Sequence, residues 1–299
     1  MKENVTILIP TLNEGKTIAD LVIRFKKQGF DDILVIDGNS VDDTVSQARS
    51  AGARVVIQNG KGKGTAIQQA FSIIERDITV MIDGDDTYLP EEVDKLIEPI
   101  SSGLADHVMG NRFVNFESGA FTRLNLLGNK ILNKIFNIDF RVNLNDILTG
   151  YRAFDKKAIK IMNLNQSGFG IEAELTVESI KKDLRIIEVP ISYRARAVGA
   201  PTKLNPLEDG FKIGYTIYEL GQTYNPMLYL SLVGAIFILG GVIVGAYVTL
   251  QWLSGINHLP LTILTALLTI TGVQIFIFGY LSDMIVKVQR ETLRELRKR

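Results

Sequence analysis

The sequence contains no cysteine and only two histidines, His107 and His258, among its 299 residues. The lack of cysteine excludes disulfide bonds, thiolate metal sites and catalysis by a thiol. Two histidines so far apart along the chain do not make a zinc site, which takes three or four protein ligands. The 33 basic and 33 acidic residues balance to a formal net charge of zero. This balance argues against a nucleic-acid partner, because such proteins carry a basic surface.

Charge is missing from one long part of the chain, because no Asp, Glu, Lys or Arg occurs between residues 220 and 282. Two apolar stretches, at about 227–252 and 259–285, each exceed the roughly 20 residues that cross a bilayer. They predict a transmembrane hairpin; the alternative is a helical hairpin buried in a soluble core. The basic tail, 287–299, should stay on the cytoplasmic side, so both termini should be cytoplasmic.

The first half of the chain alternates strand-like and helix-like segments. Short apolar runs, typical of buried parallel strands, occupy 4–9, 32–36, 54–57 and 78–82, and a further strand is expected at 108–110. Helical periodicity lies between them, at 15–28, at 42–51 and in the segment that ends near residue 74. Strands alternating with helices across short turns predict an α/β fold with a doubly wound, mostly parallel sheet.

The expected organisation has four parts. They are a cytoplasmic catalytic domain over 1–205, an interfacial amphipathic helix over 206–225, two transmembrane helices within 226–286 and the tail 287–299. A second amphipathic segment occupies 121–136, and both such segments suit either the membrane interface or an ordinary core-facing position. The apolar run that opens the chain breaks at Pro10, so we expect no signal peptide.

Asp83-Gly84-Asp85 directly follows the apolar run 78–82. Two carboxylates two residues apart in an extended chain point the same way, about 6–7 Å apart. Ligands of an open α/β sheet bind beyond the carboxyl ends of its strands. Paired oxygens in that crevice suit Mg²⁺ or Mn²⁺ held jointly with a substrate's phosphates. The motif alone also fits a loop with two solvated acids.

Two other turns carry candidate nucleotide contacts. Asp37 follows the second strand, where it either accepts from a base or ribose or simply forms a turn before Gly38. The Gly- and Lys-rich turn 59–64 opens a helix and suits a phosphate or a flexible solvated turn. Its spacing fits neither the P-loop nor the dinucleotide-binding fingerprint, so both of those classes are rejected.

Two polar clusters follow later in the chain. The segment 145–152 combines a carboxylate, a hydroxyl and an arginine, a set that suits sugar and phosphate contacts. A basic stretch just before the apolar region contains Arg194, Arg196, Thr202 and Lys203. It suits either an anchor on anionic lipid or a clamp for a phosphate that arrives from the bilayer.

Together these segments resemble the inverting nucleotide-sugar glycosyltransferases of family 2 with the A-type fold, and among them the dolichyl-phosphate mannose and glucose synthases. The resemblance covers about residues 4–205, and the two-span tail is similar to that of some members. The matching motifs, in chain order, are Pro10-Thr11-Leu12-Asn13-Glu14, Asp37-Gly38-Asn39-Ser40 with Asp43-Thr44, Gly62-Lys63-Gly64, Asp83-Gly84-Asp85, Gly110-Asn111-Arg112, Thr149-Gly150-Tyr151-Arg152, Glu188-Val189-Pro190-Ile191 and the stretch 196–203.

The resemblance implies a donor site. Asp83 and Asp85 would form the Mg²⁺ or Mn²⁺ site, with Asp83 toward the nucleotide and Asp85 on the metal that bridges the diphosphate. The residues that would bind the nucleotide beside Asp83 are Pro10, Asn13, Glu14, Asp37 and Lys63.

The resemblance also implies catalytic and acceptor contacts. Arg112 and Arg123 would contact phosphates and act in catalysis with Asp85. The lipid phosphate would be held by Arg196, Thr202 and Lys203. The sugar would be contacted, directly or through the residues that support the site, by Asp146, Thr149 and Arg152.

Three positions depart from the family pattern. Gly38 stands where relatives often carry a second Asp, and Thr87 stands at the position of a usual glutamine, which bears on a third protein ligand for the metal. The basic loop, which contains Thr202, is about one residue longer than usual.

The resemblance implies metal-dependent, inverting transfer of a hexose to dolichyl or another polyprenyl phosphate at a prokaryotic, and by preference archaeal, plasma membrane. The donor would be UDP-glucose, UDP-N-acetylglucosamine or GDP-mannose, which one pocket could accept. Alternatives are transfer to a protein or glycan acceptor and a non-catalytic membrane scaffold. A glycoside hydrolase is disfavoured, because no carboxylic acid with a raised pKa is evident.

Overall fold

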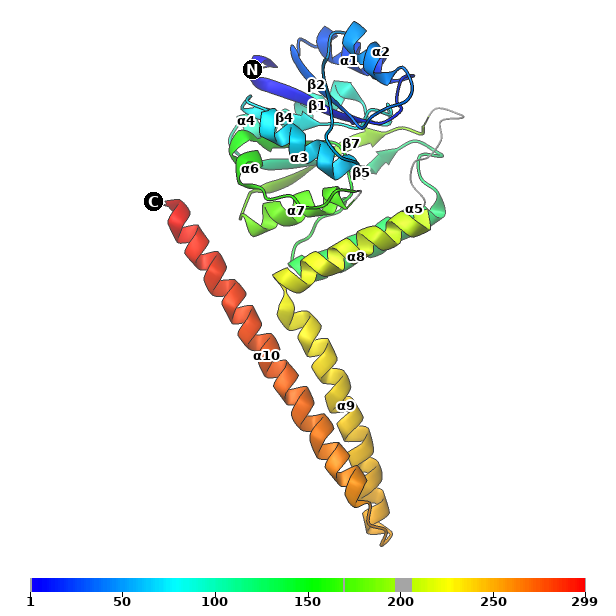
Figure 1. Cartoon of the computed structure of the whole chain (residues 1–299), viewed down its shortest axis with the longest axis vertical. Helices are drawn as coiled ribbons and strands as arrows, with labels where there is room; N and C mark the ends of the chain where they lie inside the picture. Colours follow the sequence, from blue (N-terminus) through cyan, green and yellow to red (C-terminus); the bar gives the residue numbers. More distant parts are fainter. Residues whose placement is uncertain (1, 169, 197–205, 299) are drawn as a thin grey trace. The chain divides into compact units, whose positions relative to one another are not determined.

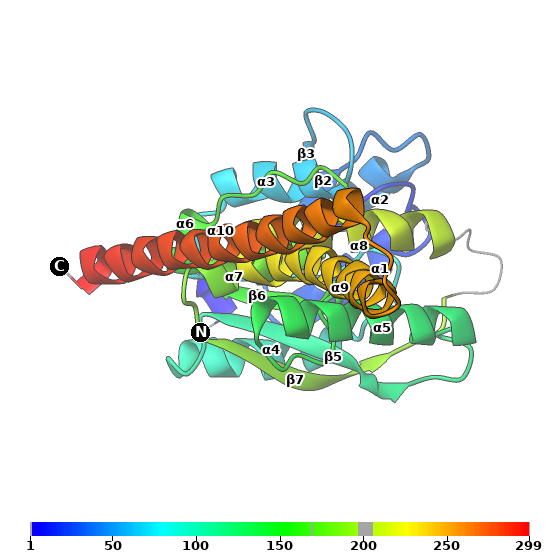
Figure 2. The ribbon, with the colours of Figure 1, turned by 90° about the horizontal axis from the view of Figure 1, so that it is seen from below.

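A computed structural model describes residues 2–168, 170–196 and 206–298. Its contacts divide the chain into two units, Met1–Tyr218 and Glu219–Arg299. Helix α8 (Pro206–Tyr224) begins in the first unit and ends in the second. Figure 1 labels most of the helices and strands, and Figure 2 adds the labels of β3 and β6.

The described residues of the first unit form one 7-stranded sheet with the order β3-β2-β1-β4-β6-β5-β7. Strand β6 runs antiparallel to its neighbours β4 and β5, and the other neighbouring strands are parallel. The strands are β1 (Val5–Thr11), β2 (Asp32–Asp37), β3 (Arg54–Ile57), β4 (Ile78–Met81), β5 (His107–Phe116), β6 (Arg152–Asp155) and β7 (Ile186–Tyr193). The predicted doubly wound, mostly parallel sheet is confirmed.

Helices cover both faces of this sheet, because successive residues of a buried strand point to opposite sides. Ile7 and Ile9 of β1 face one core, while Leu8 between them faces the other. The first core is closed by α1 (Ile18–Lys27), α2 (Thr44–Ser50) and α4 (Val93–Ser101). The second is closed by α3 (Lys63–Ile73), α6 (Lys156–Ile161) and α7 (Ile171–Lys181), which lie together in Figure 1.

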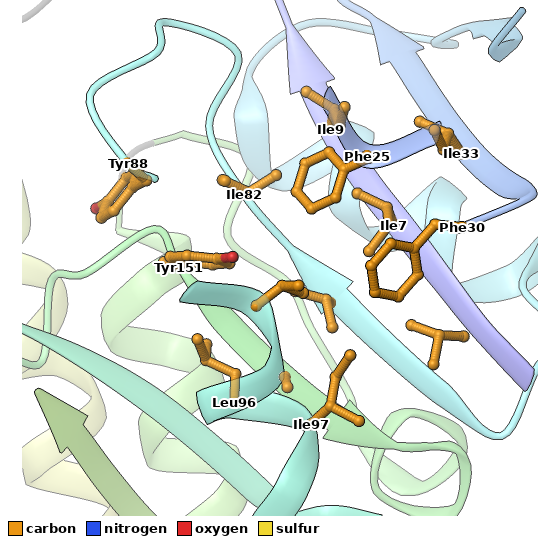
Figure 3. Close-up of a cluster of buried hydrophobic side chains, with 14 of the residues drawn as sticks. Ile7, Ile9, Phe25, Phe30, Ile33, Ile82, Tyr88, Leu96, Ile97 and Tyr151 are labelled. Carbon is orange, nitrogen blue, oxygen red and sulfur yellow. The ribbon is translucent and has the colours of Figure 1, made fainter. Parts of the chain in front are cut away.

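The first core holds β1 against α1. Phe25 and Phe30 pack edge to face, with ring centroids 5.9 Å apart, and Figure 3 shows both rings beside Ile7 and Ile9. All four side chains are fully buried. Burial of each such side chain stabilises the fold by about 1.5–3 kcal/mol relative to exposure. The core therefore fixes the central strands and, with them, the loops that leave their ends.

The carboxyl ends of β1, β2 and β4 meet at one edge of the sheet. Thr11 at the end of β1 pairs with Asp37 at the end of β2, and Met81 at the end of β4 pairs with Leu8. The chain segments that follow these three strands therefore leave the sheet close together. Ligands of open α/β sheets bind beyond this edge.

Several elements were not predicted from the sequence. Strand β5 is longer than the expected 108–110, and α4, α6, α7, β6 and β7 were not anticipated. Helix α7 lacks an amphipathic pattern because it is buried on all sides from Ile171 to Ser179, acidic residues included. Strand β6 spans 4 residues and α6 spans 6, which is too short for a period to emerge. Two 3₁₀ turns, Lys2–Asn4 and Pro90–Glu92, and the long helix α5 (Arg123–Phe140) complete the first unit.

The second unit is a helical hairpin of α9 (Pro226–Leu253) and α10 (Leu259–Lys298), which lie side by side in Figures 1 and 2. The segments Pro226–Leu253 and Leu259–Gln289 have mean hydropathies of 2.5 and 2.1, and each is long and apolar enough to cross a membrane. A Cβ atom added to Gly234 would lie 2.9 Å from the carbonyl oxygen of Gly272. Glycine thus lets the two backbones approach closely, as is common between membrane helices.

The hairpin should be sensitive to side chains at Gly241. A Cβ atom there would lie 2.6 Å from Thr269 Oγ1 and 3.2 Å from its backbone nitrogen. We expect Gly241→Leu to destabilise the hairpin by about 1–3 kcal/mol through overpacking. The control is Gly240→Leu, because the nearest atom to a Cβ there is Leu268 Cδ1 at 3.9 Å. Thermal unfolding in detergent should show a lower midpoint for the first variant only, and equal midpoints would contradict this packing.

Candidate active site

Asp85 lies at the centre of the carboxyl edge, in the loop after β4. Its Oδ1 accepts hydrogen bonds from the hydroxyl of Thr87 at 2.7 Å and from the Thr87 backbone nitrogen at 3.3 Å. Its Oδ2 accepts from Nε of Arg196 at 2.9 Å, and the Nη2 of the same arginine forms the ion pair. Burial lowers the pKa of Arg196, but the charge of Asp85 outweighs it and holds that pKa above its ordinary value.

Asp83 is bound by a lysine that it shares with a second acid. Lys63 Nζ lies 2.6 Å from Asp83 Oδ1 and 2.6 Å from Glu172 Oε1. A Cβ atom added to Gly150 would lie 2.3 Å from Asp83 Oδ2, so only glycine leaves room for this carboxylate. Burial lowers the pKa of Lys63, but the charges of Asp83 and Glu172 outweigh it and raise that pKa above its ordinary value.

The two carboxylates suit a divalent metal that also binds phosphate oxygens. Among the described residues, no group of three or more His, Cys, Asp or Glu is arranged to hold a metal. Mg²⁺ is commonly held by one or two carboxylates together with substrate phosphates, so the donor set fits. In this structure each acid already binds a cation, Asp83 the ammonium of Lys63 and Asp85 the guanidinium of Arg196. Thr87 orients Asp85 through its hydroxyl in the position where the family usually has glutamine.

The Gly- and Lys-rich turn before α3 is exposed over residues 59–62, and its end packs against another loop. A Cβ atom at Gly62 would lie 2.2 Å from the carbonyl oxygen of Ser167, and one at Gly64 would lie 1.9 Å from that of Gln166. The backbone nitrogen of Gly64 donates to Ser167 O at 2.9 Å. These glycines therefore allow close backbone packing, and that packing places Lys63 beside Asp83.

Arg112 is held in place by Asp146. Its Nε and Nη2 donate to the two oxygens of that carboxylate at 2.7 Å each, and its guanidinium lies 5.3 Å from the ring centroid of Tyr193. Burial lowers the pKa of Arg112, but Asp146 outweighs it and raises that pKa well above its ordinary value. Asp146 is completely buried, so it orients an arginine rather than facing the site itself.

Arg152 and Thr149 lie behind the site rather than in it, because both are completely buried. Arg152 donates from Nε to the carbonyl of Thr149 at 2.8 Å and from Nη2 to that of Ile147 at 2.6 Å. Burial lowers the pKa of Arg152 to about 10. The arginine therefore fixes the loop that presents Asp146 to Arg112 and Gly150 to Asp83.

The predicted nucleotide residues gather near the ends of β1 and β2. Pro10 is buried within β1, Asn13 is exposed, and Glu14 is half-buried. Asp37 is completely buried, and its oxygens accept from the backbone nitrogen of Ser40 at 2.8 Å and from the Ser40 hydroxyl at 2.5 Å. Asp37 thus has the turn-forming geometry, which was one of its two predicted roles. It orders the loop that contacts Asn13 through Ser40.

The remaining predicted residues are placed as follows. Arg123 is exposed at the first turn of α5, whose N-cap is Thr122. Arg196 binds Asp85, whereas Thr202 and Lys203 lie outside the described residues.

Sequence reasoning missed Glu172, the second acid on Lys63. The signal available in the sequence was an acid between two apolar residues, Ile171 and Ala173. It also missed Tyr88, whose hydroxyl accepts from the Gly150 nitrogen at 2.8 Å.

The first unit, which is hereafter called the catalytic unit, has the A-type fold of nucleotide-sugar glycosyltransferases. The fold resembles that of glucosyl-3-phosphoglycerate synthase from Mycobacterium tuberculosis, with a TM-score of 0.62 and 24% sequence identity over 73% of this chain and 79% of that one. The family model for glycosyl transferase family 2 matches residues 6–162. The chain therefore belongs to glycosyl transferase family 2.

Two archaeal relatives extend this assignment. The chain is 39% identical over 294 residues to glycosyltransferase AglJ of Haloferax volcanii, which covers 98% of this chain and 97% of that protein. It is also 31% identical over 222 residues to a dolichyl-phosphate hexose transferase of the same organism. The matched region covers 73% of this chain and 94% of the relative. The predicted family and the prediction of an enzyme are both confirmed.

The lysine shared by Asp83 and Glu172 should be essential for the fold of the site. Lys63→Met leaves the buried carboxylate of Glu172 and the partly exposed carboxylate of Asp83 without their shared cation, so we expect a loss of about 3 kcal/mol in stability. The double variant Lys63→Met/Glu172→Gln should recover part of it, because one of the two charges is gone. Thermal unfolding followed by circular dichroism measures both effects. Equal midpoints for the single variant and the unchanged protein would contradict the ion pair.

Stability should fall in mildly acidic solution because of His107. Burial, and then the charge of Arg152, hold the pKa of His107 well below its ordinary value of 6.5. The unfolded chain therefore binds a proton that the folded chain does not, and stability is lost as the pH falls below about 6.5. Urea titrations between pH 7.5 and 5.5 should show this loss, and His107→Gln should reduce it. If the free energy of unfolding fell equally with pH in both proteins, the loss would belong to other titrating groups.

Proposed function

We propose that this enzyme transfers a hexose from a nucleotide-diphosphate sugar to a polyprenyl phosphate such as dolichyl phosphate, with inversion and with a divalent metal. The observation that carries the proposal is the contact between Asp85 and Arg196 at the carboxyl edge of the sheet. It puts an acid suited to a metal–diphosphate beside a base suited to an acceptor phosphate. The name of the Haloferax volcanii dolichyl-phosphate hexose transferase supports the acceptor.

We propose that Asp85 and Asp83 have different roles in binding the donor. A metal held by Asp85 would supply positive charge to the diphosphate as it leaves. Asp83, turned toward Lys63, would face the nucleoside together with Asn13 and Glu14. UDP-glucose, UDP-N-acetylglucosamine and GDP-mannose are the candidate donors.

The acceptor needs no separate general base. A phosphate monoester has a second pKa of about 6 and is already mostly ionised at neutral pH. One of its oxygens can form a bond to the anomeric carbon while the bond from that carbon to the diphosphate oxygen breaks. Attack from the side opposite the leaving group inverts the centre. Arg112, oriented by Asp146, and Arg123 are proposed to stabilise phosphate charge, and Arg196 to hold the acceptor phosphate.

The catalytic unit presents an apolar surface that suits a bilayer. On α5 the side chains of Leu124, Leu127, Ile131, Ile135 and Ile138 are all exposed, and the nearby Lys130 and Lys134 are also exposed. Helix α8 adds exposed Phe211 and Tyr215, and it lies against α5, since a Cβ atom at Gly214 would be 3.5 Å from Leu132. Such basic amphipathic helices bind membrane interfaces. We propose a plasma-membrane enzyme with both termini cytoplasmic.

The test is a transfer assay with purified protein in detergent and Mg²⁺ or Mn²⁺. Radiolabelled UDP-glucose, UDP-N-acetylglucosamine and GDP-mannose are offered in turn, each with and without dolichyl phosphate. We expect one donor to yield label in the organic phase only when the lipid is present. Label in protein or glycan instead would favour the alternative acceptors, and no transfer from any donor would favour a binding scaffold.

Asp85→Asn should lower the transfer rate by about 100-fold or more, because the metal loses its charged ligand. The matched control is Asp86→Asn at the next position. Asp86 has φ 57°, which asparagine tolerates, and it pairs with Arg24 at 2.6 Å rather than with the site. Initial rates with the donor identified above measure both variants. Full activity of the Asp85 variant would refute the metal role.

A further inference from the structure

Asp85 and Arg196 have been given separate roles, yet they bind one another. The proposed metal ligand is Asp85, and the proposed acceptor-phosphate ligand is Arg196. In the structure the guanidinium lies on Asp85 Oδ2 through Nε at 2.9 Å and also through Nη2. The carboxylate is 10% exposed and the arginine 29% exposed, so water screens this pair only in part.

The other oxygen of Asp85 is already held from the protein side. Oδ1 accepts from the Thr87 hydroxyl at 2.7 Å. Thr87 is itself anchored, because it is 1% exposed and its carbonyl accepts from the backbone nitrogen of Arg194 at 2.8 Å. The exchangeable oxygen is therefore Oδ2, which is the one that Arg196 binds.

A divalent cation and a guanidinium cannot both bind Oδ2, since two positive centres so close repel one another strongly. We propose that the metal, arriving with the nucleotide diphosphate, displaces Arg196 from Asp85, and that the displaced guanidinium then binds the acceptor phosphate. This inference rests on the proposed function. It orders the reaction, because the acceptor ligand is masked until the donor site is loaded.

A neighbouring arginine lacks this arrangement. Arg194 contacts Glu117 at 3.8 Å, and its side chain is 42% exposed. It precedes Arg196 by two residues on the same segment and therefore provides a matched control.

The first experiment measures metal binding without turnover. Mn²⁺ is titrated into the full-length protein with saturating UDP, and free Mn²⁺ is followed by electron paramagnetic resonance. We expect Arg196→Gln to tighten Mn²⁺ binding by about tenfold, because the competing cation is gone; tenfold corresponds to about 1.4 kcal/mol. Arg194→Gln should leave the affinity unchanged. Unchanged or weaker binding by the Arg196 variant would overturn the proposal.

The second experiment measures the acceptor side. Farnesyl phosphate serves as a short isoprenyl phosphate in isothermal titration calorimetry. We expect it to bind the unchanged protein about tenfold more tightly with Mn²⁺ and UDP than without them. In Arg196→Gln this difference should disappear. Equal affinities in the unchanged protein, or a difference that persists in the variant, would overturn the exchange.

These outcomes are separate from the transfer assay. If the enzyme used another acceptor, no lipid-linked label would form, yet the Mn²⁺ titration would still report whether Arg196 competes for Asp85. If transfer to dolichyl phosphate were observed and the Mn²⁺ affinity were unchanged, the proposed function would stand and the exchange would fall.

Discussion

Carboxylates that are buried or partly buried must be compensated, and this constraint organises the carboxyl edge of the sheet. Water stabilises a charged group, so a carboxylate that leaves water needs a cation or hydrogen-bond donors to remain charged. Asp83 receives Lys63, Asp85 receives Arg196, and Asp146 receives Arg112. Each base comes from a different element of the fold. Two of these contacts join the start of α3 and the segment after β7 to the loop that follows β4, and the third joins the middle of β5 to the loop before β6.

A second layer of polar groups keeps that edge in shape without touching a substrate. Arg152 is completely buried and donates to two loop carbonyls rather than to a carboxylate. Tyr88 accepts from the nitrogen of Gly150 on the same loop. Because unpaired groups would be costly at this depth, the loop has few alternative conformations. Precise placement of Asp83 and Arg112 follows from contacts that lie behind them.

The apolar helices account for the remainder of the chain. The α9–α10 hairpin has the length and composition of membrane-crossing helices. The exposed apolar residues of α5, such as Leu127 and Ile131, belong to the catalytic unit. In the proposed function both features serve a substrate whose tail stays in the bilayer while its phosphate reaches the enzyme. A soluble enzyme of this family would have no need for either surface.

The sequence by itself determined the parallel α/β fold, the acids after β4, the family and the uncharged hairpin, because these depend on periodicity, length and local motifs. Only the tertiary structure decided which charges meet. Lys63 and Glu172 are more than a hundred positions apart, as are Asp85 and Arg196, and nothing local indicates either pair. The packing role of Gly62 and Gly64 was likewise decided by neighbours distant in sequence, whereas the turn role of Asp37 rests on Ser40, three positions away. Local patterns fix elements, whereas burial and charge compensation act between residues that only the folded chain brings together.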